Sequence, residues 1–383
     1  MKEKVLFVAY NAFNRGGIQN VVMNIVKNLH DDYIFDLLCF QEDKGTLEET
    51  FLSYGGEIIK YPTYYAGRNV FLKRLDYYVR GFKIFGRTRN AIRENGPYRV
   101  VHCNNALESG VCLLAAKLEK VPVRISHAHT NFRSCENVVR RGIDIVYRSL
   151  INRYSTKQIG CSEEACEALF GRRAETAVLP SPYDCSKFDP VQYAETKFDV
   201  PSMIQVASYS SNKNQLFSIT VLEEVVKKYP EARLSFVGFE SEAEYLEKVE
   251  EAVWKNGLEK NVSFFPSDAD IPFLMSEASY FLFPSVAEGF GLAPVEAQAM
   301  GLRCFVSDSI PASCDCGGCC FLPLNRGAGV WADAIIEDFE ETTGKHGTYD
   351  CGKFSISSVC QKYRALYRNL SEEHNETGKS ISG

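Results

Sequence analysis

Apolar runs and amphipathic stretches alternate along this 383-residue chain. Short runs rich in Val, Ile, Leu and Phe, such as residues 4–9 and 34–40, predict buried strands. Between such runs, apolar residues recur every three or four positions, which predicts amphipathic helices. Strands that alternate with helices are typical of a parallel sheet covered on both faces, so the pattern predicts an α/β fold. The clearest helical stripe consists of Ile18, Val21, Val22, Ile25, Val26 and Leu29.

The alternation occurs twice, and a loop-rich segment at residues 180–201 separates the two sets. Because the chain is longer than one hydrophobic core usually serves, we predict two doubly wound domains, at residues 1–185 and 186–352. A helix is expected at 353–372 and a disordered polar tail at 373–383. Strands are predicted at 4–9, 34–40, 57–61, 100–102, 123–126, 158–161, 203–208, 233–238, 262–265, 280–283 and 304–307. Helices are predicted from 17, at 70–95, at 143–152, from 162, at 216–228, at 242–256 and from 294.

The stretch at residues 284–301, PSVAEGFGLAPVEAQAMG, places Glu288 and Glu296 eight residues apart across a Gly-Phe-Gly loop. It follows a buried-strand run, and Pro294 is suited to the first turn of a helix. A helix N-terminus offers unpaired backbone N–H groups and a positive dipole end, which suit a phosphate. Glu296 in the first turn would then accept hydrogen bonds from ribose hydroxyls. The alternative is an ordinary strand-to-helix turn with solvated acids.

Several segments, in the expected order, resemble the retaining, GT-B-fold glycosyltransferases of family 4. The E-x7-E signature of that family matches EGFGLAPVE, and the likeness extends over nearly the whole chain to about Leu370. It is strongest with the bacterial branch that builds capsular and exopolysaccharide repeat units. The resemblance implies two Rossmann-like domains facing across a cleft, with the C-terminal helix crossing back to the first domain. The other matching segments are VLFVAYNAFNRGGIQNVVMNIVKNL, VHCNNA, RISHAHTN, IGCSEEACEALFG, IQVASYSSNKNQ, LSFVGF and GLRCFVSDSIP.

The resemblance also assigns roles to individual residues. It implies that His127 lies near the transferred sugar, that Glu288 holds donor-sugar hydroxyls or lines the acceptor side, and that Glu296 binds the ribose. The other donor-binding candidates are Gly16, Gly17, Lys213, Gly289, Phe290, Gly291 and Leu292. Further candidates are His129, Ser208, Asn214, Arg124 and Arg133, the two arginines as cations from the first domain that could share the diphosphate charge.

Each of these residues also has an ordinary structural interpretation. Gly16 and Gly17 could form a turn that needs positive φ, Lys213 could be a solvated lysine, and His127 could be a core or capping histidine.

Two segments depart from the family pattern. Ala207 and Ser208 stand where the family usually has Gly-Arg, which removes a bidentate phosphate ligand and leaves Lys213 as the cation of that segment. Pro180 to Asp184 reads PSPYD, where many members read P-N-G-[IV]-D.

Sequence patterns for bound cofactors are weak. The chain contains no G-x-G-x-x-G, which argues against nicotinamide or flavin chemistry, and no D-x-D precedes the Glu288 loop, so we expect a metal-independent reaction. The cysteines of CDCGGCC at 314–320 are too closely spaced, and too far from any histidine, to favour zinc. We expect the 14 cysteines to be reduced for the most part.

Charge is distributed unevenly. Residues 1–190 contain 27 Lys and Arg against 21 Asp and Glu, whereas the remainder contains 16 against 28. The basic surplus concentrates at 51–157, in aromatic-rich helical stretches that either lie on an anionic membrane or are solvated helix faces. A nucleic-acid partner is disfavoured because no nucleic-acid-binding motif accompanies these lysines and arginines. No run of 18 apolar residues and no signal-peptide pattern is evident, so we expect a cytoplasmic protein peripherally associated with the inner face of the membrane.

These observations predict a retaining glycosyltransferase that moves a hexose or N-acetylhexosamine from a nucleoside diphosphate sugar, with UDP favoured, to a lipid-linked saccharide. Two alternatives remain open at this point. One is a UDP-sugar epimerase of the same fold, and the other is a catalytically weakened nucleotide-sugar-binding scaffold subunit, suggested by Ser208.

Overall fold

The computed structural model describes residues 2–9, 13–14, 16–63, 70–130, 138–172, 174–194 and 196–379, without the side chains of 70–78, 138–139 and 369–379. The chain forms two compact units. The first consists of Met1–Pro182 and Ile356–Gly383, and the second is Tyr183–Ser355. The chain therefore leaves the first unit at Pro182, close to the expected boundary, and returns to it at Ile356.

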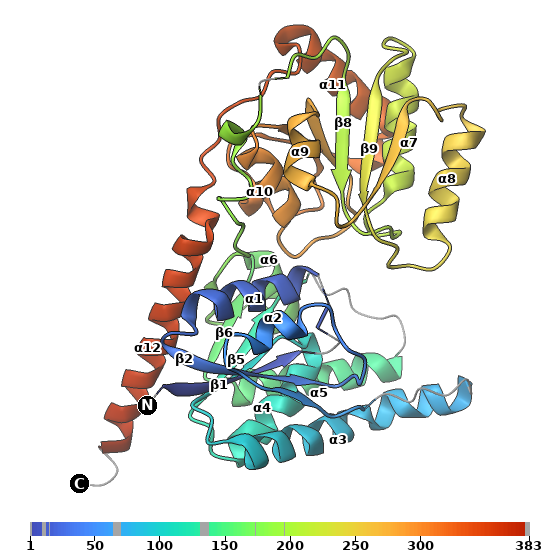
Figure 1. Cartoon of the computed structure of the whole chain (residues 1–383). Coiled ribbons are helices and arrows are strands. Elements are labelled where there is room, and N and C mark those ends of the chain that lie inside the picture. The colour runs from blue at the N-terminus through green and yellow to red at the C-terminus, as the bar shows by residue number, and fades with distance from the viewer. Residues whose placement is uncertain are drawn as a thin grey trace. The chain divides into compact units, whose positions relative to one another are not determined.

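The first unit contains a seven-stranded parallel sheet in the order β3-β2-β1-β4-β5-β6-β7. Helices α1 and α2 lie on one face of this sheet, and α3, α4 and α5 lie on the other (Figure 1). The strands are β1 (Glu3–Ala9), β2 (Tyr33–Cys39), β3 (Ile58–Lys60), β4 (Val100–Cys103), β5 (Val123–Ala128), β6 (Lys157–Gly160) and β7 (Ala177–Val178). The helices are α1 (Gly17–Leu29), α2 (Glu48–Leu52), α3 (Val70–Asn95), α4 (Ser109–Leu118), α5 (Val138–Tyr154), α6 (Glu163–Phe170) and α12 (Ile356–Lys379).

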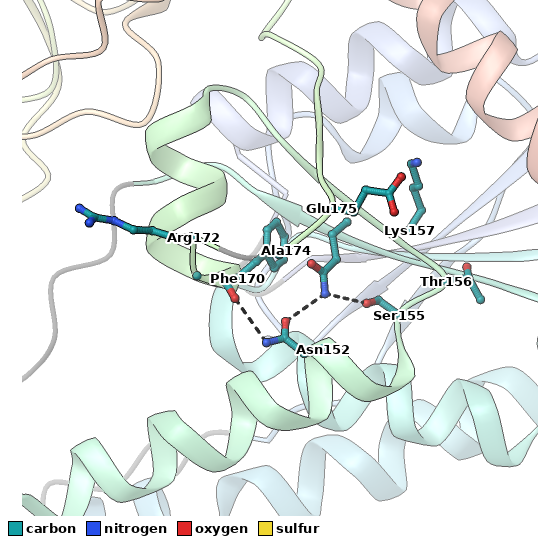
Figure 2. A pocket seen from close by; sticks show the side chains of 10 residues that line it. Asn152, Ser155, Thr156, Lys157, Phe170, Arg172, Ala174 and Glu175 are labelled. Atoms are coloured by element: carbon teal, nitrogen blue, oxygen red, sulfur yellow. Dashed lines mark hydrogen bonds between the residues drawn. The ribbon is translucent and has the colours of Figure 1, made fainter.

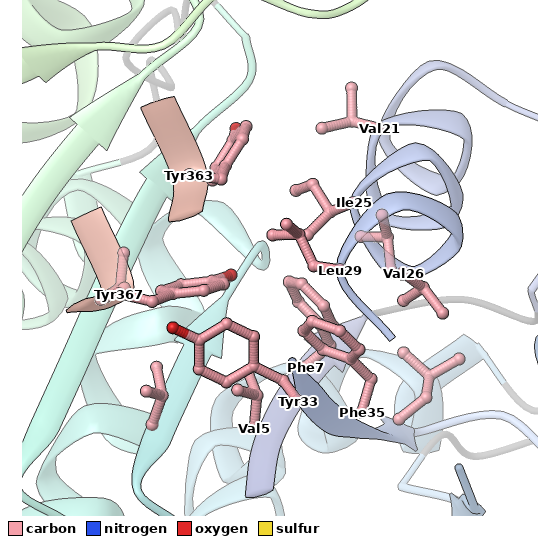
Figure 3. Packing of buried hydrophobic residues seen from close by; sticks show 14 of the residues in the cluster. Val5, Phe7, Val21, Ile25, Val26, Leu29, Tyr33, Phe35, Tyr363 and Tyr367 are labelled. Carbon is pink, nitrogen blue, oxygen red and sulfur yellow. The ribbon is translucent and has the colours of Figure 1, made fainter. Parts of the chain in front are cut away.

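The core of the first unit joins three segments that are distant in the sequence. The apolar stripe of α1 is buried from Val21 to Leu29 against β1, as its period predicts. Helix α12 adds Tyr363 and Tyr367, both fully buried, and Tyr367 meets Tyr33 with ring centroids 5.4 Å apart. Figure 3 shows these two tyrosines pointing from α12 into the core. Burial of a large side chain contributes on the order of 1.5–3 kcal/mol, so α12 is an integral part of this unit.

The second unit contains a six-stranded parallel sheet in the order β10-β9-β8-β11-β12-β13. Its core packs α7, α8 and α11 against the sheet around the fully buried Trp331 and Tyr280. The strands are β8 (Ser202–Val206), β9 (Arg233–Gly238), β10 (Val262–Pro266), β11 (Tyr280–Phe283), β12 (Arg303–Ser307) and β13 (Cys319–Leu322). The helices are α7 (Gln215–Val226), α8 (Tyr245–Lys255), α9 (Ile271–Ser276), α10 (Leu292–Ala299) and α11 (Ala328–Thr342).

Every predicted strand is present within a few residues, whereas several helices were missed. Helix α4 lies between α3 and α5 and is buried on nearly all sides, so its sequence SGVCLLAAKL carries no clear amphipathic period. Helices α2, α9 and α11 and strands β7 and β13 were also not predicted. The expected disorder from residue 373 is wrong as far as Lys379, because α12 continues through that segment. Residues 380–383 lie outside the described chain.

Candidate functional site

Both sheets have the strand order that creates a topological switch point. In the first sheet, the order in which consecutive strands are added reverses between β1 and β4. In the second sheet, it reverses between β8 and β11. Ligands of open parallel sheets bind beyond the carboxyl ends of the strands at such points. The candidate ligand-binding loops are therefore those that follow β1, β4 and β5 in the first sheet and those that follow β8 and β11 in the second.

In the second unit, the loop after β8 is joined to the loop after β11. The backbone N–H of Val286 donates to the carbonyl of Asn212 at 2.8 Å, and Asn212 Nδ2 donates to the carbonyl of Ala287 at 2.9 Å. Asn214, with φ 58°, lies in the left-handed region that asparagine tolerates. Its Nδ2 donates to the carbonyl of Pro284 at 3.2 Å. Asn214, predicted as a possible donor ligand, thus holds the two loops together.

Lys213 and Glu288 come together across these joined loops. Lys213 Nζ lies 2.5 Å from Glu288 Oε1, and both side chains are largely buried. The ammonium also lies 5.6 Å from the centroid of the Phe283 ring, at the end of β11. A charge-assisted hydrogen bond of this kind fixes the position of both charged groups. The pair therefore places one cation and one carboxylate at the switch point of the second sheet.

Gln205 was missed by sequence reasoning, although it supports this pair. It is buried in β8, and its Nε2 donates to the carbonyl of Lys213 at 2.8 Å. Ser218 Oγ, in α7, donates to Gln205 Oε1 at 2.7 Å. The available signal was a polar residue inside a buried-strand run, which needs a hydrogen-bond partner.

The Gly-Phe-Gly loop leads into α10, which begins at Leu292, two residues before the predicted start. Gly291 is its N-terminal flanking residue with φ 96°, a conformation that glycine adopts without strain, and no side chain caps this end. Leu292 is half-buried and Gly289 is buried. Phe290 is also buried and packs edge-on against Phe354, with centroids 5.2 Å apart. The loop is thus anchored by its aromatic ring and leaves the helix N–H groups without a side-chain acceptor.

Glu296 lies in the second turn of α10. Its side chain is half-buried, and no described residue donates a hydrogen bond to its carboxylate. Burial raises the pKa of Glu296 to about 7, an effect that the positive charge of Lys187 opposes. A carboxyl group poised in this way changes its charge near neutral pH.

Ser208 lies just after β8, where the family pattern has arginine. Gln215 Nε2 donates to its backbone carbonyl at 3.0 Å. Gly238 of β9 lies directly against this turn, because a Cβ at that position would come within 2.0 Å of the Ala207 carbonyl oxygen. Lys213 is the only basic residue between 203 and 226.

In the first unit, Gly16 and Gly17 lie at the start of α1. Gly16 is extended, with φ −177°, and Gly17 is the first helical residue. The alternative that these glycines form a turn with positive φ is therefore wrong. A Cβ on Gly17 would meet no atom within 4 Å, so the chain itself does not require glycine there. The absent side chain instead leaves open space at the uncapped helix N-terminus.

His127 is fully buried at the end of β5. Three other polar residues of this unit, His102, Tyr367 and His129, form a group with it. His127 Nδ1 lies 3.2 Å from Nε2 of His102 in β4, and His102 Nδ1 lies 2.8 Å from the hydroxyl of Tyr367 in α12. Nε2 of His127 is buried and has no hydrogen-bond partner among the described residues. The ring of His129 lies beside it, with centroids 3.8 Å apart. The structure thus brings both predicted histidines together.

His129 has a separate anchor. Its Nε2 lies 2.8 Å from Asn104 Oδ1, in the loop after β4. Burial lowers the pKa of both His102 and His129 to about 3 and holds that of His127 well below its usual range. All three rings are therefore neutral at physiological pH. His102 and Asn104 belong to the matching segment VHCNNA, but no residue pattern singled out Tyr367.

Arg124, one of the two predicted arginines, does not join this group. Arg124 stands near the amino end of β5, and its guanidinium donates to the carbonyls of Tyr154 and Val121, at 2.7 Å each, and of Pro122 at 2.9 Å. It therefore lies at the edge of the sheet opposite to the carboxyl ends and is engaged there. Arg133 lies outside the described residues.

A hollow of about 600 Å³ opens at that opposite edge of the first sheet. Figure 2 shows its lining, which includes Asn152, Lys157, Arg172 and Glu175. Gln158 Nε2 bridges Asn152 Oδ1 and Ser155 Oγ at 3.0 and 3.1 Å. This hollow begins at the amino end of β6 and does not coincide with the switch point.

Two absences within the described chain bear on metals and membranes. Within the described residues, no group of three or more His, Cys, Asp or Glu side chains is arranged to hold a metal ion, and the cysteines at 314–320 are free thiols. None of the helices in the described ranges combines the length and the apolar character that a membrane crossing needs.

Two glycosyltransferase profiles match the chain. The family described as Glycosyltransferase Family 4 matches residues 15–187, and that described as Glycosyl transferases group 1 matches residues 194–316. The chain is 30% identical over 350 residues to "Putative glycosyltransferase EpsF" of Bacillus subtilis, covering 87% of each protein. The chain therefore belongs to the family 4 glycosyltransferases, and it is a glycosyltransferase.

Other relatives and a solved structure share this likeness. "Capsular polysaccharide biosynthesis glycosyltransferase CapH" of Staphylococcus aureus is 25% identical over 298 residues, covering 77% of this chain and 78% of CapH. "UDP-Gal:alpha-D-GlcNAc-diphosphoundecaprenol alpha-1,3-galactosyltransferase" of Escherichia coli is 25% identical over 232 residues, covering 55% and 58%. The crystal structure of Anabaena HepE in complex with UDP has a TM-score of 0.69 at 18% identity, covering 98% of this chain and all of the other. The two Rossmann-like units thus constitute a GT-B fold.

Proposed function

We propose that this chain transfers a hexose or N-acetylhexosamine from a UDP-sugar to a lipid-linked saccharide in capsular or exopolysaccharide assembly, with retention of the anomeric configuration. The observation that carries this proposal is the Lys213–Glu288 pair at the switch point of the second sheet, next to the uncapped start of α10. A cation, unpaired helix N–H groups and a carboxylate that suits ribose are the groups that a nucleoside diphosphate requires.

The donor is bound by the second unit in this proposal. Lys213 Nζ and the first N–H groups of α10 neutralise the diphosphate, while Glu296 accepts hydrogen bonds from the ribose hydroxyls. Glu288 holds Lys213 in place and offers its remaining oxygen to the sugar. Two similar proteins, HepE in its complex with UDP and the E. coli UDP-Gal transferase, support uracil as the base.

The reaction in this proposal proceeds by same-face substitution. The departing diphosphate accepts the proton of the acceptor hydroxyl, and the protein supplies orientation and electrostatic stabilisation. His127 donates to a sugar oxygen from its otherwise unpartnered Nε2. Glu288 is not assigned as a nucleophile in this proposal; it holds Lys213 and hydrogen-bonds the sugar. We further propose that Lys213 takes the place of a divalent ion, so that EDTA leaves the rate unchanged.

The acceptor in this proposal is presented at an anionic membrane surface. Phe82 in α3 is 80% exposed, and Ile145 and Val146 in α5 are 64% and 56% exposed. Gly81 lies against the ring of Tyr147, so these apolar side chains come from neighbouring turns of the two helices. The E. coli relative is named for a diphosphoundecaprenol-linked acceptor, which supports a lipid-linked saccharide here.

Three arginines of the basic stretch at 51–157 are engaged within the protein. Arg80 pairs with Glu108 at 2.9 Å, and Arg89 and Arg93 pair with Glu119 at 2.6 and 2.8 Å. The membrane surface is therefore better defined by Phe82, Ile145 and Val146 than by the whole basic stretch.

The proposal is tested by incubating the purified chain with UDP- and GDP-linked sugars, with and without vesicles that carry polyprenyl-diphosphate saccharides. We expect nucleotide release from a UDP-sugar to depend on the lipid-linked acceptor. NMR of the product should show that the anomeric configuration of the donor is retained. Release that needs water alone and inverts a hydroxyl of the sugar would identify an epimerase. Tight UDP binding without turnover of any donor would identify a scaffold subunit.

A further inference from the structure

A chain of hydrogen bonds runs from Tyr367 on α12 through His102 to His127, and its direction determines where the protons lie. The three members, Tyr367, His102 and His127, are each at most 1% exposed. Two hydrogen bonds join them in sequence, at 2.8 Å between Tyr367 and His102 and at 3.2 Å between the two rings. Since burial keeps both imidazoles neutral, each ring carries one proton, and the direction of the chain decides which nitrogen holds it.

Two directions are possible. In the first, the Tyr367 hydroxyl donates to His102 Nδ1, His102 Nε2–H donates to His127 Nδ1, and the proton of His127 resides on Nε2. In the second, every bond is reversed, and Tyr367 accepts from His102 Nδ1–H. The hydroxyl proton would then need another acceptor, yet no described residue supplies one. In the first direction the donor without a described partner is His127 Nε2–H, which stands at the carboxyl end of β5, where a water or sugar oxygen can accept from it. Tyr367 is enclosed in the core, where no such acceptor can reach its hydroxyl. Leaving a buried donor without a partner costs on the order of 1–3 kcal/mol, so the first direction is favoured.

We infer that Tyr367 is a positioning residue for His127, and that through His102 it fixes the His127 proton on Nε2 as a donor to an oxygen of the bound sugar or its diphosphate. The inference rests on the proposed function, in which His127 meets the donor. Burial also raises the pKa of Tyr367 well above its usual value, so the hydroxyl keeps the proton that the chain requires. The tautomer of His129 has a separate cause, because Asn104 Oδ1 accepts from His129 Nε2–H.

The same helix offers a matched control. Tyr363 stands one turn before Tyr367 and is equally buried in the core of the first unit (Figure 3). No residue in the described part of the chain hydrogen-bonds its hydroxyl. Replacing either tyrosine with phenylalanine removes one buried hydroxyl and leaves the ring in place. Only Tyr367→Phe removes the donor at the start of the chain.

The test compares both variants in the full-length protein. We expect Tyr367→Phe to lower kcat for sugar transfer about 10-fold while KM for the donor changes less than about 2-fold, as for loss of an interaction made in the transition state. Tyr363→Phe should stay within about 2-fold of the wild type in both. Equal kinetic effects of the two substitutions would overturn the inference.

A second readout requires no substrate. Long-range ¹H–¹⁵N spectra of the imidazoles, assigned with His127→Gln, should show His127 as the Nε2–H tautomer in the wild type and in Tyr363→Phe. In Tyr367→Phe, the spectra should show a mixture of both tautomers. A wild-type His127 protonated on Nδ1 would refute the inference, even if the protein proves to be an active UDP-sugar transferase. Conversely, failure to use any nucleotide sugar would refute the proposed function and leave the tautomer result standing.

Discussion

The two units have the same strand order at their switch points but different chemistry beside them. In the second unit, a lysine and a glutamate meet at 2.5 Å, and another carboxyl group has a pKa of about 7. In the first, buried imidazoles with strongly lowered pKa values are connected to a tyrosine hydroxyl. The second unit therefore presents charge, whereas the first presents neutral hydrogen-bonding groups of fixed orientation.

This difference matches the two halves of a nucleotide sugar. A diphosphate carries negative charge, which a partly buried cation and helix N–H groups stabilise. A sugar is neutral, so it offers no opposite charge to offset the cost of burying a charged donor. A neutral imidazole that offers one N–H recognises a sugar oxygen without that desolvation cost. The comparison leads to four predictions, ordered from the largest expected effect to the smallest.

The first prediction is that Lys213→Ala lowers kcat/KM for the donor by about 100-fold. Lys213 is the only basic residue of its segment, and loss of a charged hydrogen bond costs on the order of 1.5–3 kcal/mol. Lys227→Ala, which removes an exposed surface ion pair with Glu224, is the matched control and should have no measurable effect. Both variants are compared with the wild type by steady-state kinetics with a UDP-sugar. An unchanged rate in Lys213→Ala would show that another cation binds the diphosphate.

The second prediction is that Glu296→Ala weakens UDP binding by about 10-fold or more, because ribose hydroxyls lose a charged acceptor. Titration calorimetry measures this loss directly. Glu244→Ala, at the start of α8, is an exposed control that should bind UDP normally. Wild-type UDP affinity in Glu296→Ala would show that Glu296 does not bind the ribose.

The third prediction concerns pH. Because the pKa of Glu296 is raised to about 7, its carboxylate form is dominant at pH 8 and its protonated form at pH 6. UDP affinity should therefore fall by up to about 10-fold between pH 8 and pH 6 through this group. The phosphates of UDP also titrate in this range, so the measurement is the difference between the wild type and Glu296→Gln. Parallel pH profiles would contradict the raised pKa.

Sequence reasoning located the charged half of the site better than the neutral half. The loops around Lys213 and Glu288 follow apolar strands and contain glycine, asparagine and charged residues, which are visible as local patterns. The pairing of Tyr367 with His102 joins residues 265 positions apart, through a helix whose buried face looks like ordinary core. Such contacts depend on where α12 docks, and helix periodicity alone does not specify a docking position. Arg124 was misjudged for a different reason. The predicted strand at 123–126 already placed it near the amino end of β5, whereas ligands of such sheets bind beyond the carboxyl ends.

The last prediction concerns the exposed apolar side chains on the outer surface of the first unit. Phe82 is 80% exposed on α3, and Trp254 is 70% exposed on α8 of the acidic second unit. Inserting a phenylalanine side chain into a bilayer interface contributes on the order of 1–2 kcal/mol. Phe82→Glu should therefore weaken binding to anionic vesicles by about 10-fold, whereas Trp254→Glu should bind as the wild type does. Both variants should keep wild-type UDP affinity, since neither position lies near the switch-point loops. If flotation with vesicles is unchanged in Phe82→Glu and insensitive to salt, the α3–α5 surface is a solvated face, and a soluble saccharide becomes the better acceptor to test.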